Sequence, residues 1–169
     1  MQNILRGKQN RARGLAFEQM ISQACLYYEQ LGLAKIEKTP EPMSIIERLP
    51  GGRFVACFQK KAQPDYKGTL KGGRTVVFES KYTSGGKMLD SVVLDVQAKS
   101  LDAYSSLGAV CFILVGFSSG NCYRIPWSTW RNMKEEFGHK YFTEEQAARY
   151  KVNTGARLLF LAGLTEKNV

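Results

Sequence analysis

The feature that most constrains this chain's fold is an uninterrupted apolar run at Ala109–Gly116. Its residues, Ala-Val-Cys-Phe-Ile-Leu-Val-Gly, include no charged side chain. Such a run is typical of a strand that is covered on both faces. Apolar spacing predicts one helix over Gly14–Leu31, and a second is expected from Asp95 to about Ser106. At 169 residues, the alternation of helices and strands predicts one α/β domain, with a central mixed β-sheet flanked by helices.

A second strand is expected over Arg74–Tyr82, and it carries charges that the first one lacks. Glycine pairs bound it on both sides, and its residues are rich in β-branched and aromatic types. Side chains alternate between the two faces of a strand, so Glu79 and Lys81 project from the same face. An acid and a base therefore stand together on an otherwise apolar strand.

Asp65 precedes this strand in the segment Pro64-Asp65-Tyr66-Lys67-Gly68. The turn-prone residues 67–73 predict a hairpin that brings Asp65 beside Glu79. Two adjacent carboxylates repel each other unless a cation joins them, and their hard oxygens suit Mg²⁺ or Mn²⁺. Such an ion polarises a phosphoryl oxygen and lowers the pKa of a bound water, while Lys81 either orients that water or stabilises charge on phosphorus. The pattern is that of metal-dependent phosphodiester hydrolysis.

A plainer interpretation of the same residues remains open. Pro-Asp followed at a distance by Glu-x-Lys is a short and degenerate pattern. Glu79 and Lys81 would also suit a surface hairpin on which they form a weak ion pair.

Charge favours a nucleic-acid partner over this plainer interpretation. The formal net charge is +9, and the segment from Arg53 to Lys87 holds eight basic residues against two acids, Asp65 and Glu79. A site for a phosphate backbone shows this distribution. An anionic membrane surface is the second candidate partner. The plainest interpretation is a basic surface that contacts only solvent. The candidate DNA-binding residues are Arg6, Arg11, Arg13, Lys60, Lys61, Lys67, Lys71 and Lys87.

The rest of the composition bears on the cellular compartment and on the domain boundaries. The four cysteines have no zinc-type spacing and there is a single histidine, which disfavours a structural zinc site. Neither a signal peptide nor a membrane-length apolar run is recognisable, so we expect a cytoplasmic protein. We expect residues 1–13 to form a flexible basic arm and residues 14–169 a single domain. An insertion at about residues 40–61 reads as a projecting hairpin.

Two further polar residues lie on expected helices. Glu18 stands on the first turn of the Gly14–Leu31 helix. Its carboxylate either interacts with the helix dipole or supplies a third acid to the metal site. Gln97 lies on the inward face of the Asp95–Ser106 helix, and a buried amide needs partners. It either bonds a backbone group or faces the metal site, and pattern alone favours the backbone.

Taken together, these residues resemble the PD-(D/E)xK nuclease superfamily, and within it the RecU-type Holliday-junction resolvases. The resemblance runs from about Arg13 to about Leu161. It is carried by Gly14-Leu15-Ala16-Phe17-Glu18, Phe58-Gln59-Lys60-Lys61, Pro64-Asp65, Phe78-Glu79-Ser80-Lys81, Gln97 and the Gly108–Ile113 strand.

The resemblance implies a restriction-endonuclease-like core with an inserted stalk, and a homodimer. It makes Asp65, Glu79 and Gln97 ligands of Mg²⁺ or Mn²⁺, and Lys81 the group that stabilises the transition state. The family often has threonine two residues before the aspartate; this chain has Gln63, which substitutes for it or leaves the ligand set shorter. The compact length suits a phage-encoded member acting in the bacterial host cytoplasm.

The function expected from the sequence is paired, metal-dependent cleavage of four-way DNA junctions, with recombination proteins as possible partners. Two alternatives stay open. One is another PD-(D/E)xK nuclease of the restriction or repair type, and the other is a non-catalytic DNA-binding recombination module.

Overall fold

The computed structural model describes residues 2–40, 42–58 and 63–165, with the backbone alone for residues 2–8 and 58. Within these ranges six strands form one mixed sheet, in the order β1-β4-β5-β7-β8-β10. All neighbouring strands are antiparallel except β5 and β7, which are parallel. The strands are β1 (Ala34–Lys38), β4 (Tyr66–Leu70), β5 (Thr75–Thr83), β7 (Val110–Phe117), β8 (Cys122–Pro126) and β10 (Lys151–Val152).

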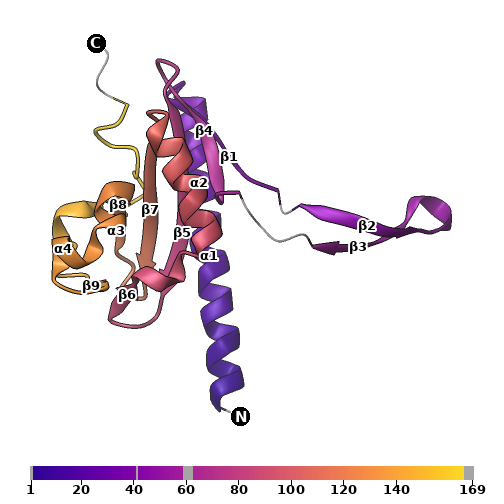
Figure 1. Ribbon diagram of the computed structural model, residues 1–169, viewed down its shortest axis with the longest axis horizontal. Coiled ribbons are helices and arrows are strands. Elements are labelled where there is room, and N and C mark those ends of the chain that lie inside the picture. Colours follow the sequence, from indigo (N-terminus) through magenta and orange to yellow (C-terminus); the bar gives the residue numbers. More distant parts are fainter. Residues whose placement is uncertain (1, 41, 59–62, 166–169) are drawn as a thin grey trace.

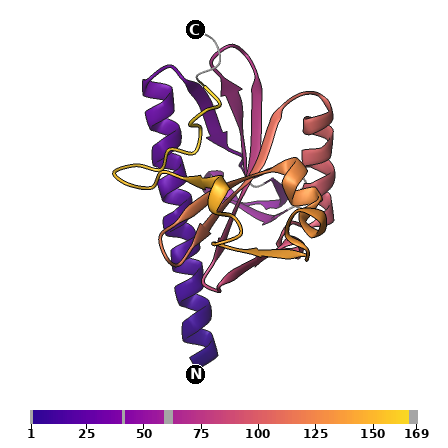
Figure 2. The ribbon, with the colours of Figure 1, turned by 90° about the vertical axis from the view of Figure 1, so that its left-hand side faces the viewer.

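Helices cover both faces of this sheet. Figure 2 shows the sheet between α1 (Gln2–Gln30) and α2 (Asp95–Ser106). The core on the α1 side includes Ile21 and Phe78, and the core on the α2 side includes Leu101 and Ile113. Every residue of β7 after Val110 is buried, as expected of a strand covered on both faces. The mixed α/β architecture predicted from the sequence is therefore confirmed.

Apart from the insertion between β1 and β4, the remaining described elements are two short helices, two 3-10 helices and a second, smaller sheet. A two-stranded ribbon pairs β6 with β9 antiparallel. The bounds are β6 (Lys87–Leu89), η2 (Asp90–Val92), α3 (Trp127–Arg131), α4 (Met133–Phe137), β9 (Tyr141–Thr143) and η3 (Ala148–Tyr150).

The first half of α1 corrects a prediction. The helix begins at Gln2 rather than at Gly14, so residues 2–13 continue α1 instead of forming a separate arm. In Figure 1 this half extends beyond the body of the protein. The stretch is rich in Arg, Lys and Gln, which form helices readily. It lacks the apolar periodicity by which a packed helix is recognised in a sequence.

The insertion between β1 and β4 is a second projection. Strands β2 (Met43–Arg48) and β3 (Phe54–Phe58) pair antiparallel, and η1 (Pro50–Gly52) forms the turn. Figure 1 shows this hairpin reaching away from the sheet. Its exposed large apolar side chains are Met43, Ile45, Ile46, Phe54 and Val55. None of the described helices combines the length and hydropathy that crossing a membrane would need.

Candidate active site

The β4–β5 hairpin brings the two predicted carboxylates together. Tyr66 pairs with Phe78, which places Asp65 next to Glu79 at the open end of the hairpin. The backbone N–H of Asp65 donates to Oε1 of Glu79 over 3.2 Å. In return, the backbone N–H and the hydroxyl of Ser80 donate to Oδ2 of Asp65, over 3.1 and 3.3 Å. These reciprocal bonds fix both acids against the same pair of strands.

Hydrogen bonds join each pair among the side chains of Glu79, Lys81 and Gln97. Nζ of Lys81 donates to Oε2 of Glu79 over 3.2 Å and to Oε1 of Gln97 over 3.3 Å. Nε2 of Gln97 donates to the same Oε2 of Glu79 over 2.5 Å. A strand and a helix from different parts of the chain thus meet through polar groups inside an apolar layer. Buried polar networks of this kind hold their members in one arrangement.

Gln97 bonds a backbone group, as one of the two alternatives from the sequence expected, and it also bonds Glu79. Its Oε1 accepts the backbone N–H of Leu94, just before the first turn of α2, over 3.1 Å. Its Nε2 meanwhile reaches the carboxylate of Glu79. The side chain therefore closes the start of α2 and faces the candidate site at once.

Glu79 is an unusual carboxylate. Its side chain is completely buried, whereas that of Lys81 is 18% exposed. The pKa of Glu79 is raised to about 7, chiefly by burial and next by the nearby charge of Asp65, while Lys81 partly opposes the rise. Burial in low dielectric disfavours the ionised form, and so does a like charge. The site is therefore short of positive charge, and a group that supplied it would stabilise the ionised carboxylate.

These residues fit a hard divalent cation. Asp65 and Glu79 offer carboxylate oxygens and Gln97 an amide oxygen, which are the donors that Mg²⁺ and Mn²⁺ prefer. The raised pKa of Glu79 means that its ionised form is destabilised at this position, and an added cation would stabilise that form. In the described ranges, however, no three acidic, histidine or cysteine side chains are gathered closely enough to hold a metal ion. Any remaining coordination positions would fall to water or substrate.

Glu18 and Gln63 are bonded to lysines. Oε2 of Glu18 pairs with Nζ of Lys38 over 2.5 Å. Oε1 of Gln63 accepts Nζ of Lys67 over 2.7 Å, on an exposed loop. Each would have to exchange a lysine for an ion in order to act as a metal ligand.

The candidate DNA-binding residues are spread over several elements. Arg11 and Arg13 are exposed on α1 near its protruding half, and Lys71 is exposed at the β4–β5 turn. Lys87 is exposed on β6, with its Nζ 4.6 Å from the ring centroid of Tyr141. Lys60 and Lys61 lie outside the described residues, and of Arg6 only the backbone is described.

Sequence reasoning overlooked Ser80, whose two hydrogen bonds hold the Asp65 carboxylate. Its position between Glu79 and Lys81 in the sequence could have suggested this role, because a hydroxyl near two carboxylates can donate a hydrogen bond to one of them. Alternation along the strand argues against such a role, since Ser80 points to the face opposite Glu79. The carboxylate of Asp65 reaches it because Asp65 lies just before β4.

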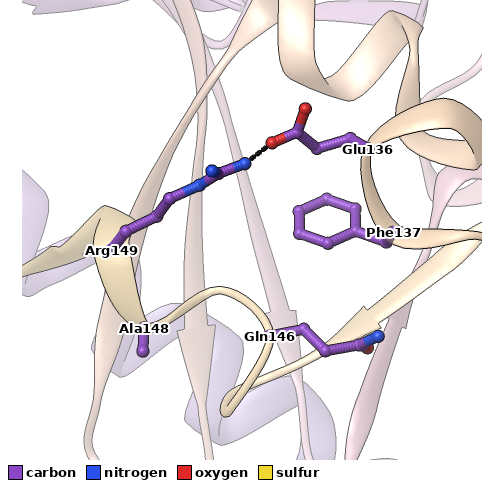
Figure 3. A pocket seen from close by; sticks show the side chains of 5 residues that line it. All are labelled: Glu136, Phe137, Gln146, Ala148 and Arg149. Atoms are coloured by element: carbon purple, nitrogen blue, oxygen red, sulfur yellow. Dashed lines mark ion pairs between the residues drawn. The ribbon is translucent and has the colours of Figure 1, made fainter.

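A surface pocket of about 460 Å³ offers a second location for a site. Figure 3 shows Arg149 and Glu136 reaching toward each other across it, with Phe137, Gln146 and Ala148 completing the lining. The Tyr150 hydroxyl also donates to Glu136, so the charges in this pocket are already compensated. It lies on α4, η3 and the loop before η3, away from the strands that carry Asp65 and Glu79. We assign it no catalytic role.

Comparison with known families and curated proteins covers most of the chain. The family model described as "RecU: Recombination protein U" matches residues 12–163. The chain is 33% identical over 113 residues to a Holliday junction resolvase RecU of Streptococcus sanguinis, covering 63% of this chain and 56% of that protein. It is 26% identical over 148 residues to the RecU of Geobacillus kaustophilus, covering 82% and 74% respectively. The chain thus spans little more than half the length of its streptococcal relatives.

Among solved structures, the chain is similar to the Holliday junction resolvase Hjc of Archaeoglobus fulgidus. The alignment covers 78% of this chain and 92% of that chain, with a TM-score of 0.48 and 10% sequence identity.

Proposed function

The chain belongs to the RecU family, and from this membership we propose that it is a Holliday-junction resolvase. In this proposal it is an endodeoxyribonuclease that cuts four-way DNA junctions in pairs by hydrolysing phosphodiester bonds. The observation that carries the proposal is the joint placement of Asp65, Glu79 and Lys81 inside the segment that the family model matches.

Asp65, Glu79 and Gln97 would hold Mg²⁺ or Mn²⁺, with Gln63 and Glu18 as candidates for supporting contacts. When bound, the ion supplies Lewis acidity at a phosphoryl oxygen and lowers the pKa of a water. Gln97 would need to adjust in order to contribute, because its nitrogen now faces Glu79 and its oxygen accepts Lys81 and Leu94. Exchanging the two ends of the amide would turn the oxygen toward Glu79.

Lys81 would stabilise the negative charge that builds on phosphorus during hydrolysis. Its ammonium group donates to Glu79 and Gln97, which would hold it at the site, and its side chain is 18% exposed, which would let a substrate reach it. Glu79 fixes the position of this ammonium, and Ser80 fixes that of the Asp65 carboxylate. The chain's own residues thus supply the oriented charge, and DNA supplies the phosphate.

The same proposal covers the rest of the molecule. The sheet and its flanking helices would form a restriction-endonuclease-like core, with the β2–β3 hairpin as the stalk of the family. Basic side chains on α1, the β4–β5 turn and β6 would contact phosphates without reading bases. Two copies would join as a homodimer, so that two active sites face two strands. Such an enzyme would act in the bacterial cytoplasm, alongside other recombination proteins.

The direct test is to incubate the protein with a four-way junction, a linear duplex, a nicked duplex and a flap in Mg²⁺. Paired nicking of the junction in preference to the other substrates is expected. Asp65→Asn should abolish cutting while leaving junction binding largely intact, and Asp95→Asn, an exposed acid on α2, serves as the matched control.

The other outcomes distinguish the alternative functions. Cutting of linear duplex as readily as of the junction indicates a restriction or repair nuclease. Binding of the junction without any cutting indicates a DNA-binding module. Full activity of Asp65→Asn would end the proposal for this site.

A further inference from the structure

Thr39 carries a buried hydroxyl group that the site described so far does not use. The residue directly follows β1 and is 6% exposed. Its Oγ1 is buried without a hydrogen-bond partner among the described residues. Nearly all buried polar side-chain atoms in native proteins are hydrogen-bonded, and leaving one unpaired costs about 1–3 kcal/mol. Such an atom calls for a partner that the described residues do not supply.

The strand register places Thr39 in the same row as the two carboxylates. Lys38 pairs with Tyr66, and Tyr66 pairs with Phe78. One residue further along, the backbone N–H of Thr39 donates to the carbonyl oxygen of Asp65 over 2.8 Å. Asp65 in turn donates to Glu79. Thr39, Asp65 and Glu79 therefore follow one another across three adjacent strands.

Alternation also assigns Thr39 to the appropriate face. Ile36 packs in the core on the α1 side, and Lys38 pairs with Glu18 of α1. Thr39 is the next residue after Lys38, and its backbone bond to Asp65 continues the pairing of β1 with β4. Alternation therefore assigns its side chain to the opposite face, the face from which Glu79 meets α2. Residues directly opposite each other in an antiparallel pair have Cβ atoms about 4.5–5.5 Å apart. That separation suits a bridge of one water between Thr39 and a group bound at Asp65.

We propose that Thr39 is a positioning residue of the cation site, and that its hydroxyl holds a water in the hydration shell of the divalent ion. Mg²⁺ and Mn²⁺ usually keep several waters in protein sites, and groups that orient these waters tune affinity. The unpaired hydroxyl then gains its partner when the ion binds. This inference rests on the proposed function, because it takes the ion to bind at Asp65 and Glu79.

The test compares Thr39→Val with Thr39→Ser in titrations with Mn²⁺, without DNA. Valine keeps the shape and removes the hydroxyl, whereas serine keeps the hydroxyl. Thr39→Val should bind Mn²⁺ about 10-fold more weakly, as is typical when a supporting contact around a metal is lost. Thr39→Ser should stay close to wild type. The metal-free Thr39→Val protein should unfold at the same or a higher temperature, because no existing hydrogen bond is removed.

Each other result overturns the inference. Unchanged Mn²⁺ affinity in Thr39→Val means that the hydroxyl has no part in the site. Equal weakening in both variants means that shape rather than the hydroxyl matters. A lower unfolding temperature of metal-free Thr39→Val means that the hydroxyl already has a partner in the protein.

The failure of this inference can be told apart from the failure of the proposed function. If Mn²⁺ binds to wild type and Asp65→Asn abolishes that binding, the proposed site stands whatever Thr39 does. If wild type does not bind Mn²⁺, the proposed function fails too.

Discussion

The backbone N–H of Asp65 donates to the side chain of Glu79 over 3.2 Å, so the main chain of one acid holds the carboxylate of the other. The contact keeps two groups of like charge adjacent at the open end of the hairpin. Its cost appears at Glu79, whose pKa is raised to about 7 by burial and, to a lesser degree, by the charge of Asp65. Burying Glu79 beside Asp65 thus costs stability, which a cation at the proposed site would offset.

The first prediction concerns the pH dependence of stability. An acid with a raised pKa holds its proton more tightly when folded, so the free energy of unfolding falls as pH rises from the unfolded value near 4.5 to the folded value near 7. The loss is on the order of 3 kcal/mol and is complete above pH 7. Denaturant unfolding of metal-free protein between pH 4 and 8 measures it. Glu79→Gln should flatten this part of the profile, and saturating Mn²⁺ should reduce the loss.

A second prediction concerns Lys81. Lys81→Met removes the ammonium and keeps most of the side chain's length. Cleavage should slow by about 10²–10³-fold, the usual effect of losing a group that stabilises transition-state charge. Junction affinity should change little. Single-turnover cleavage and gel-shift titrations separate the two effects, with Lys134→Met on α4 as the exposed control. A variant that cuts normally but binds poorly would make Lys81 a DNA contact instead.

The β4–β5 part of the site was predictable because it is local in sequence. Glycine-rich turns and strict alternation decide which side chains share a face, and this was enough to place Asp65 beside Glu79 and to align Lys81 with it. The covering of both faces of β7 followed from its unbroken apolar run.

The rest depends on contacts that leave no local pattern. The pairing of β1 with β4 spans the whole hairpin insertion, so nothing near Thr39 indicates that it adjoins Asp65. The orientation of the Gln97 amide is decided by Leu94 and Glu79 together. The helical start of α1 escaped prediction because residues 2–13 show no apolar stripe at helical spacing.

A third prediction tests the close approach of β1 to β4 at Gly68. A Cβ at this position would lie 2.1 Å from the carbonyl oxygen of Lys35 and 2.6 Å from Cα of Ile36. Both are backbone atoms, so the strands would have to separate. Gly68→Ala should lower the free energy of unfolding by about 3 kcal/mol or more. Gly86→Ala, where the added carbon meets nothing within 4 Å, should be close to neutral, and thermal unfolding compares the two. Equal stability of both variants would contradict the pairing of β1 with β4.

The last prediction concerns two of the exposed basic side chains that we propose contact DNA. If Lys71 and Lys87 each contact a phosphate, removing one should weaken binding to junction and duplex alike and lower the salt slope of log K by about 1. Lys87 has the more defined position, because its ammonium group rests over the ring of Tyr141. The measurement uses Asp65→Asn protein, which should bind without cutting, over a range of salt concentrations. Lys134→Ala should leave the slope unchanged. A loss confined to the junction would mean that the lysine reads junction shape, whereas an unchanged slope would place the DNA path elsewhere on the surface.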